Sequence, residues 1–232
     1  MELKSIAFIP DGNRRFAKKA KISMVEAYSL GTNKAWDVIN WIKDYNKIKV
    51  GTFYTLSLEN LSRSASELNI LFKIFENELD KVQNTSFFED NQLKLKFIGR
   101  LEQFPKRLKE KMSAVEKRTE NFSKKTINLA LGYNGQAEIV DAAKKVAEQY
   151  KHGLLKLNDL TMDSFKNFLY ASFPEPDLII RTSGTQRLSG FLTYQSSYSE
   201  LYFCKKYWPE FSKTDLNEAI TSFNERKRKF GK

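Results

Sequence analysis

The chain has 232 residues, of which 41% are hydrophobic and 29% are charged, so it is long enough to bury a core as a single domain over residues 1–232. Lysine and arginine number 39 and aspartate and glutamate 28, and the resulting net charge of +11 predicts an anionic partner. The only cysteine, Cys204, excludes an internal disulfide and a cysteine-cluster zinc site. The only histidine, His152, is expected at a helix end on the surface, which argues against a Ser-His-Asp triad and a multi-histidine metal site.

Six short segments rich in apolar and β-branched residues are predicted to be strands. They cover residues 5–9, 49–55, 93–98, 126–131, 178–181 and 201–203. Helix-start signals or helical spacing of apolar residues predict helices over residues 23–42, 64–82, 106–121, 137–150, 161–169 and 214–229. Capping boxes are predicted at Ser23 with Glu26 and at Ser64 with Glu67, and Thr214 is predicted to cap the last helix.

Strands that alternate with helices predict an α/β fold with a central, mostly parallel sheet flanked by helices. In such sheets, ligands bind beyond the carboxyl ends of the strands. Polar clusters that follow predicted strands are therefore the candidate site.

The start of the chain lacks the apolar run and cleavage region of a signal peptide, and no window has the apolar length of a membrane span. We therefore expect a cytoplasmic protein with, at most, a peripheral contact with a membrane. The basic stretch from Arg226 to Lys232 is read either as a solvated helix face or as a contact with anionic lipid.

The first polar cluster follows the strand at residues 5–9 and reads Pro10-Asp11-Gly12-Asn13-Arg14-Arg15, where a helix is about to start. Free N–H groups at a helix start attract phosphate, and arginine adds charge-assisted hydrogen bonds. A carboxylate among so many positive charges fits phosphate binding if Asp11 holds a Mg²⁺ ion that the phosphates also ligate. The alternative is a plain turn with solvated arginines.

Two further clusters follow later strands. The run from Ser57 to Arg63 is either a polar site loop or a loop that leads into the next helix. The run from Arg181 to Ser189 is rich in glycine and hydroxyl groups, and its backbone N–H groups are expected to form a nest for an anion. It lacks the Gly-Lys-Ser/Thr ending of a Walker loop, and the chain has no GxGxxG dinucleotide motif.

Glu200 is a lone acid in an aromatic stretch next to the last predicted strand. A buried carboxylate needs a cation, and a metal shared with Asp11 would supply one. The alternative is a surface glutamate. Phe72, Phe75, Phe87 and Phe88 are expected either to line an apolar slot or to pack in the core.

Taken together, these segments resemble the cis-prenyltransferases, the undecaprenyl diphosphate synthase-like enzymes. The resemblance covers nearly the whole chain in order and rests on IAFIPDGNRRFAKK, TLSLENLSR, DLIIRTSGTQRLSGFLTYQSSYSELYF and WPEF. It implies a homodimer that, with Mg²⁺, condenses isopentenyl diphosphate repeatedly with an allylic prenyl diphosphate to give a Z-polyprenyl diphosphate, a lipid carrier precursor.

The resemblance also implies roles for individual residues. Asp11 is expected to bind Mg²⁺ and act in catalysis, Glu200 to be a second metal ligand, and Asn60 to accept a proton. The residues expected around the allylic diphosphate and along the substrate loop are Gly12, Asn13, Arg14, Arg15, Phe16, Ser57, Leu58, Glu59, Leu61 and Arg63. The residues expected at the isopentenyl diphosphate site are Arg181, Arg187, Leu188 and Ser189.

Several positions depart from the commonest bacterial pattern. Leu61 stands where Trp is usual, Thr185 replaces a frequent Glu, and Gly190 a frequent Asn. Tyr28 and Thr32 stand where Arg and His are frequent, and Lys229-Phe230-Gly231 replaces an Arg-x-Gly that often reaches across the dimer. These changes bear on diphosphate binding rather than on the metal site.

The residues leave the proton acceptor open among Asn60 with Ser57, an acid, and the diphosphate itself. Rival functions are weaker. The chain lacks recognisable nucleic-acid motifs, so no nucleic acid partner is expected. A silent binding subunit is expected to have lost the aspartate or the loop arginines, and a phosphatase is expected to have a second Asp two residues after Asp11.

Overall fold

The computed structural model describes residues 2–226, and its centre is one sheet of six strands. The strands are β1 (Ser5–Ile9), β2 (Val50–Ser57), β3 (Leu93–Ile98), β4 (Lys125–Tyr133), β5 (Leu178–Arg181) and β6 (Glu200–Phe203). They lie in the order β3-β4-β2-β1-β5-β6, and each neighbouring pair is parallel. The predicted α/β class is confirmed, and the sheet is parallel throughout.

The helices follow the predicted alternation closely. They are α1 (Asn13–Ala20), α2 (Met24–Ile42), α3 (Ala65–Asn84), α4 (Phe87–Asp90), α5 (Lys106–Thr119), α6 (Gly135–Lys151), α7 (Met162–Phe165) and α8 (Lys213–Glu225). Short 3₁₀ turns include η1 (Glu59–Ser62), η3 (Leu157–Asp159), η4 (Lys166–Phe168) and η5 (Trp208–Glu210). None of the helices between residues 2 and 226 is long and apolar enough to cross a bilayer.

Helix starts show where local signals decide the fold. The hydroxyls of Ser23 and Ser64 accept hydrogen bonds from the third residue of their helices, as expected for N-caps. At the last helix the predicted cap, Thr214, is wrong, because Ser212 forms a capping box with Asp215. The helix predicted over residues 161–169 has only one α-helical turn and continues as a 3₁₀ turn. The predicted basic end at residues 227–229 lies outside the described residues.

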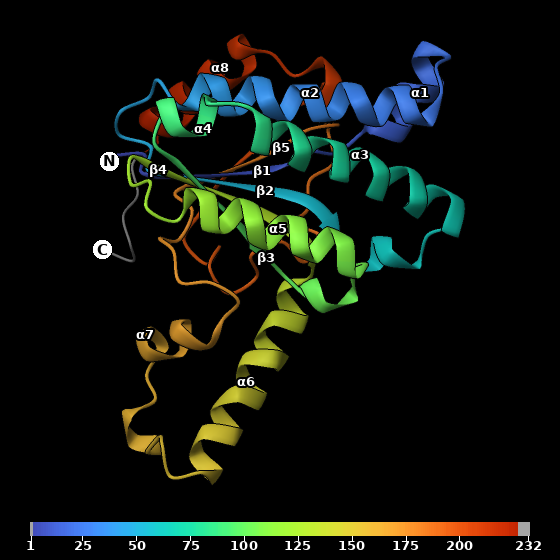
Figure 1. The fold of residues 1–232 in the computed structure, drawn as a ribbon. Coiled ribbons are helices and arrows are strands. Elements are labelled where there is room, and N and C mark those ends of the chain that lie inside the picture. Colours follow the sequence, from blue (N-terminus) through green and yellow to red (C-terminus); the bar gives the residue numbers. More distant parts are fainter. Residues whose placement is uncertain (1, 227–232) are drawn as a thin grey trace.

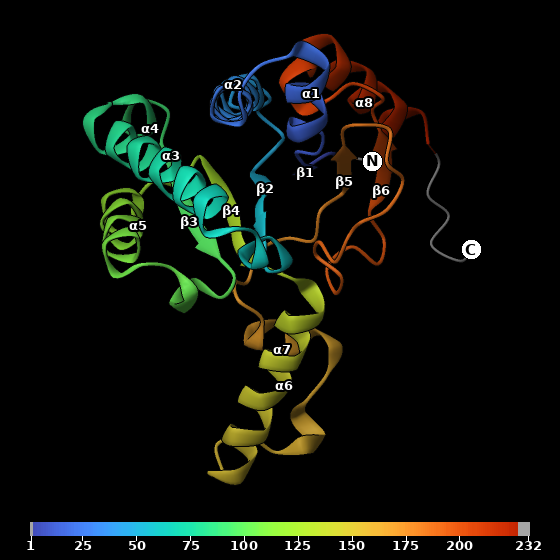
Figure 2. The ribbon, with the colours of Figure 1, turned by 90° about the vertical axis from the view of Figure 1, so that its right-hand side faces the viewer.

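The two faces of the sheet are covered unequally (Figures 1 and 2). The larger core joins one face to α2, α3, α5 and α8, with Phe8 stacked on Phe53 near its centre. The smaller core on the other face is built around Tyr54, Tyr133 and Phe191, and the segments near residues 170 and 191 pack on it. Beyond this face, α6 projects from the body as an arm with α7 beside it.

The strand order places the carboxyl ends of β2, β1 and β5 next to one another, at a switch point of the sheet. The chain runs outward from β1 through β2 on one side and returns to β5 on the other, so β1 lies between β2 and β5. Crevices at such points are where open α/β sheets bind ligands. The loops after β1, β2 and β5 therefore meet at one edge.

Because the large core includes α5, a cavity there should destabilise the whole chain. Leu108 on α5 is completely buried, whereas Lys117 on the same helix is exposed. We expect Leu108→Ala to lower the free energy of unfolding by about 2–5 kcal/mol and Lys117→Ala to change it by less than about 0.5 kcal/mol. Urea unfolding followed by circular dichroism measures both, and equal losses would contradict this packing.

Candidate active site

The site begins at the turn that links β1 to α1. Gly12 caps α1 with a φ of 108°, a conformation that favours glycine, and an added Cβ would lie 2.7 Å from Cδ1 of Tyr207. The turn is tied to the end of β5 because the Thr182 hydroxyl accepts from the Asp11 N–H (2.9 Å) and donates to the Asp11 carbonyl (2.7 Å). The first and third polar clusters are thus held together.

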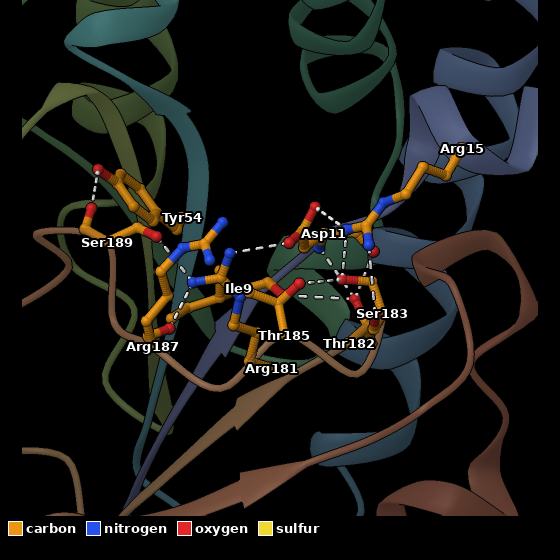
Figure 3. Close-up of polar contacts among 10 residues, drawn as sticks. All are labelled: Ile9, Asp11, Arg15, Tyr54, Arg181, Thr182, Ser183, Thr185, Arg187 and Ser189. Atoms are coloured by element: carbon orange, nitrogen blue, oxygen red, sulfur yellow. Dashed lines mark hydrogen bonds and ion pairs between the residues drawn. The ribbon is translucent and has the colours of Figure 1, made fainter.

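The Asp11 carboxylate lies between two guanidinium groups (Figure 3). Arg181 donates to one oxygen at 2.8 Å, and Arg15 donates to the other at 3.0 Å. Arg15 also donates to the Ser183 hydroxyl at 2.7 Å. The Arg181 side chain is 6% exposed and that of Asp11 27%, so the pair lies at the border between the core and solvent.

The same contacts set the charge of Asp11. Burial by itself raises the pKa of this carboxyl, but hydrogen bonds from Arg181 and Ser183 and the charges of Arg181 and Arg15 outweigh burial, and the net pKa lies below 3.8. Asp11 is therefore ionised at neutral pH and is a ready ligand for a cation.

The backbone N–H groups at the start of the loop after β5 are hydrogen-bonded to the segment that follows β6, so they do not form an open nest. The N–H groups of Ser183 and Gly184 donate to the carbonyls of Lys206 and Cys204 at 2.6 and 2.8 Å. These donors are unavailable to an anion, so the predicted nest is wrong at these two residues. The basic side chains of the mouth, with their directed donors, remain as the candidate partners of an anion.

Arg181 also organises the far part of this loop. Its second terminal nitrogen donates to the carbonyl of Arg187 and to the Ser189 hydroxyl, the latter at 2.8 Å, and its buried Nε has no partner among the described residues. The Tyr54 hydroxyl donates to the Ser189 carbonyl at 3.2 Å. The side chain of Arg187 is exposed, and Arg187 does not line the cavity described below.

The loop after β2 carries the predicted proton acceptor. The Asn60 N–H donates to the Ser57 hydroxyl at 3.2 Å, and the Ser57 N–H donates to the Asn60 side chain at 3.4 Å. Glu59 accepts from the side chain of Asn134, which follows β4. Asn134 was missed from the sequence, although its place after a strand is the signal that identified the other clusters.

A cluster of three side chains links α2 to the start of α3. The Tyr28 hydroxyl donates to Glu67 at 2.6 Å, and Arg63 donates to both, at 3.0 and 3.1 Å. Burial and the hydrogen bond to Glu67 raise the pKa of Tyr28 to about 12. The Glu67 side chain thus faces Tyr28 and Arg63, which corrects the capping box predicted at Ser64: only the serine half of it forms.

The three loops surround the mouth of a cavity of about 1130 Å³. At the mouth, Gly31 of α2 leaves room for Asn13, since an added Cβ would lie 2.4 Å from the Asn13 side-chain oxygen. Farther in, the walls are mainly apolar and come from α2, α3 and the sheet. The deeper lining includes Ala35, Ile39, Leu71, Phe72, Phe75, Leu79, Phe104 and Leu131.

Most of the predicted site residues meet at this cavity. Its lining includes Asp11, Gly12, Asn13, Arg14, Arg15, Ser57, Glu59, Asn60, Arg63, Arg181, Leu188 and Ser189. Four predicted substrate residues lie outside the lining: Phe16, Leu58, Leu61 and Arg187. Of the four phenylalanines expected to line a slot or fill the core, Phe72, Phe75 and Phe88 line the cavity, and Phe87 packs on Phe88.

Glu200 does not join Asp11 within one chain. It pairs with Leu178 at the amino end of β5, whereas Asp11 lies beyond the carboxyl end of β1. Three residues of strand, about 10 Å, separate Glu200 from the edge where the site lies. Its carboxylate accepts from Arg226 at 2.6 Å instead. The predicted metal shared by Asp11 and Glu200 is therefore wrong for a single chain.

A charged mouth that opens into a large apolar cavity fits a ligand with a charged head and an apolar tail. Comparison with known proteins agrees. Residues 9–231 match the family described as "Putative undecaprenyl diphosphate synthase".

Relatives and solved structures extend this match. The chain is 41% identical over 228 residues to a tritrans,polycis-undecaprenyl-diphosphate synthase (geranylgeranyl-diphosphate specific) of Thermoplasma acidophilum, covering 98% of this chain and 88% of that one. An enzyme of the same name from Methanocaldococcus jannaschii is 39% identical, covering 99% and 82%. Lavandulyl diphosphate synthase from Lavandula x intermedia, solved in complex with dimethylallyl diphosphate, has a TM-score of 0.94 and 32% identity, covering 100% and 99%. A probable undecaprenyl diphosphate synthase from Campylobacter jejuni has a TM-score of 0.82 and 30% identity, covering 100% of both chains.

The chain belongs to the undecaprenyl diphosphate synthase family, the cis-prenyltransferases. It is accordingly a transferase that synthesises a prenyl diphosphate.

The ion pairs at Asp11 predict a pH dependence of stability. Because the pKa of this carboxyl is lower in the folded chain than its ordinary 3.8, its contribution is complete above that pH and is lost as the pH falls through the lower folded value. Urea unfolding should show wild type more stable than Asp11→Asn near neutral pH, with a difference that shrinks below pH 3.8. A difference that stays constant with pH would contradict these ion pairs.

Proposed function

We propose that the chain adds isopentenyl diphosphate repeatedly to an allylic prenyl diphosphate at the mouth beside Asp11, and that the growing chain enters the apolar cavity. One observation carries this proposal: the arginine-lined mouth and the apolar walls belong to one continuous cavity of about 1130 Å³. A buried methylene is worth about 0.8 kcal/mol, so a lengthening prenyl chain is increasingly stabilised along these walls.

The allylic diphosphate is proposed to sit at the start of α1. The first N–H groups of a helix lack partners within the helix, and Gly12, Asn13 and Arg14 bring this end of α1 to the mouth. No acidic residue lies in the first turn to oppose an anion. We take geranylgeranyl diphosphate as the primer, because the relatives from Thermoplasma acidophilum and Methanocaldococcus jannaschii carry that specificity in their names.

Isopentenyl diphosphate is proposed to bind across the mouth, at the loop after β5. Ser189 and Leu188 line the cavity there. The exposed Arg187 precedes them in the chain, and Arg181 holds this loop by donating to the Arg187 carbonyl and the Ser189 hydroxyl. This assigns the two diphosphates to the two sides of Asp11. Arg15 and Arg181, which hold Asp11 from either side, are placed to stabilise negative charge on the leaving diphosphate.

Asp11 fits a Mg²⁺ site of the kind completed by a substrate. Mg²⁺ is commonly bound by one or two carboxylates together with substrate phosphates, and Asp11 is an ionised, partly exposed carboxylate at the diphosphate mouth. Among residues 2–226 there is no group of three or more acidic, cysteine or histidine side chains that would hold a metal alone. When bound, the ion would neutralise diphosphate charge and favour its departure.

Proton removal is proposed to occur at the loop after β2. Ser57 and Asn60 are joined by two reciprocal hydrogen bonds. The one from the Ser57 N–H to the Asn60 side-chain oxygen orients this side chain, which is the proposed acceptor. Glu59 and a diphosphate oxygen are the alternatives at the same mouth.

Asp11→Ala should lower the rate of chain elongation at least about 10²-fold because the metal ligand and the partner of Arg181 are both lost. The assay follows incorporation of labelled isopentenyl diphosphate with geranylgeranyl or dimethylallyl diphosphate as primer. Asp37→Ala, an exposed site on α2, is the matched control and should retain wild-type rates.

Chelation by EDTA should stop turnover and Mg²⁺ restore it. Full activity of Asp11→Ala, or activity without a divalent ion, would remove Asp11 from the proposed role.

The proposed homodimer rests on the projecting arm. Large apolar side chains are exposed along α6 and the segment that follows it, including Leu154 at 76% and Met162 at 82% exposure. Such exposed apolar groups mark interaction surfaces. A second copy of the chain is the occupant that we propose, as the family resemblance implies.

Wild-type protein should therefore sediment at twice the 27.0 kDa of one chain. Leu154→Glu combined with Met162→Glu should shift it toward the mass of one chain, because two charges would be buried in the contact. Val25→Glu, an exposed apolar site on α2, is the control and should leave the mass unchanged. A wild-type protein that sediments as one chain at micromolar concentration would contradict the dimer.

A cytoplasmic location and a peripheral membrane contact are part of the same proposal. They are supported by the single free and buried Cys204, by the net charge of +11, and by the apolar product that must leave for a bilayer.

A further inference from the structure

Two hydrogen bonds of the same kind join α2 to α3 across the cavity. At the mouth, the Tyr28 hydroxyl donates to Glu67 at 2.6 Å, and farther in, the Trp36 indole N–H donates to Glu78 at 2.6 Å. On α3 the two carboxylates are eleven residues apart, which corresponds to about 16 Å along the helix axis. Trp36 and Glu78 both line the cavity.

The indole of Trp36 is held by two ring contacts and one hydrogen bond. It packs edge-on against the rings of Phe87 and Phe88, with centroid distances of 5.9 and 5.6 Å. Glu78 accepts the indole N–H, and the second oxygen of Glu78 accepts from Lys81 at 2.6 Å. The ring therefore cannot swing aside without giving up this hydrogen bond and both ring contacts.

Apolar space continues beyond this pair. Val82 lies one helical turn past Glu78 on α3, and Phe88 and Leu95 also line the cavity near this end. The fixed ring and carboxylate thus lie between the apolar lining near Leu71 and Phe75 and the further apolar lining near Val82.

We propose that the Trp36–Glu78 pair is the specificity determinant that limits the length of the prenyl product. This inference rests on the proposed elongation function. A chain that advances past the pair must push the indole from its hydrogen bond and rings, and it must press methylene groups against a carboxylate oxygen that has lost its donor. Elongation then stops although apolar space remains.

The test compares product lengths among four variants and wild type, using geranylgeranyl diphosphate and excess isopentenyl diphosphate. Trp36→Phe removes the N–H donor and replaces the indole with a smaller ring, and Glu78→Leu removes the acceptor. Glu78→Gln keeps an oxygen that accepts from the indole. Trp41→Phe makes the same change on the same helix, where the ring faces Phe211 instead of the cavity.

Trp36→Phe and Glu78→Leu should each shift the main product by at least one isoprene unit toward longer chains. Glu78→Gln and Trp41→Phe should give the wild-type length. Unchanged lengths in both Trp36→Phe and Glu78→Leu would overturn the inference, as would equal lengthening in Trp41→Phe or in Glu78→Gln. Two independent residues are tested, so loss of folding in one variant leaves the other to decide. A wild-type protein that forms no polyprenyl product would instead refute the proposed function.

Discussion

The structure of the site depends on the ion pair between Arg181 and Asp11. Burying a guanidinium without a partner costs free energy. One terminal nitrogen of Arg181 pairs with Asp11, and the other donates to the Ser189 hydroxyl and the Arg187 carbonyl. One side chain therefore fixes the turn after β1 and the loop after β5 in a single arrangement. The shape of the mouth is thus held by contacts within the chain itself, and such preorganisation lowers the ordering cost of binding.

This arrangement places the charges and the apolar walls in sequence along one cavity. The sheet contributes its carboxyl ends to the mouth, while α2 and α3 form walls that continue inward from it. Because α2 and α3 are joined by two side-chain hydrogen bonds, with apolar residues between them, the walls are held at a defined separation over that length. Chemistry at the mouth and storage of the product are thus assigned to different parts of the same space.

Much of this could be predicted because it depends on local signals. Alternating segments predicted the parallel sheet, and polar residues placed after strands predicted that Asp11, Asn60 and Arg181 would meet. The prediction for Glu200 was wrong because this residue stands at the amino end of the last strand, and a parallel sheet places that end opposite the edge where the other polar clusters meet. The predicted anion nest was wrong because its N–H groups donate hydrogen bonds to the carbonyls of Cys204 and Lys206, some twenty residues later in the chain. The contact of Tyr28 with Glu67 joins residues 39 apart, which no local pattern reports.

Gly31 has a wider consequence. Its missing side chain admits Asn13 to the surface of α2, and its carbonyl accepts the Trp208 indole N–H at 2.7 Å. One residue in the middle of a helix thereby sets the spacing of α1, α2 and η5 around the charged entrance. The neighbours of Gly31 are Asn13 and Trp208, not the Trp36–Glu78 pair. Head-group recognition and product size are consequently adjustable by separate substitutions on the same helix, so descendants of this fold can acquire new primers and new products independently.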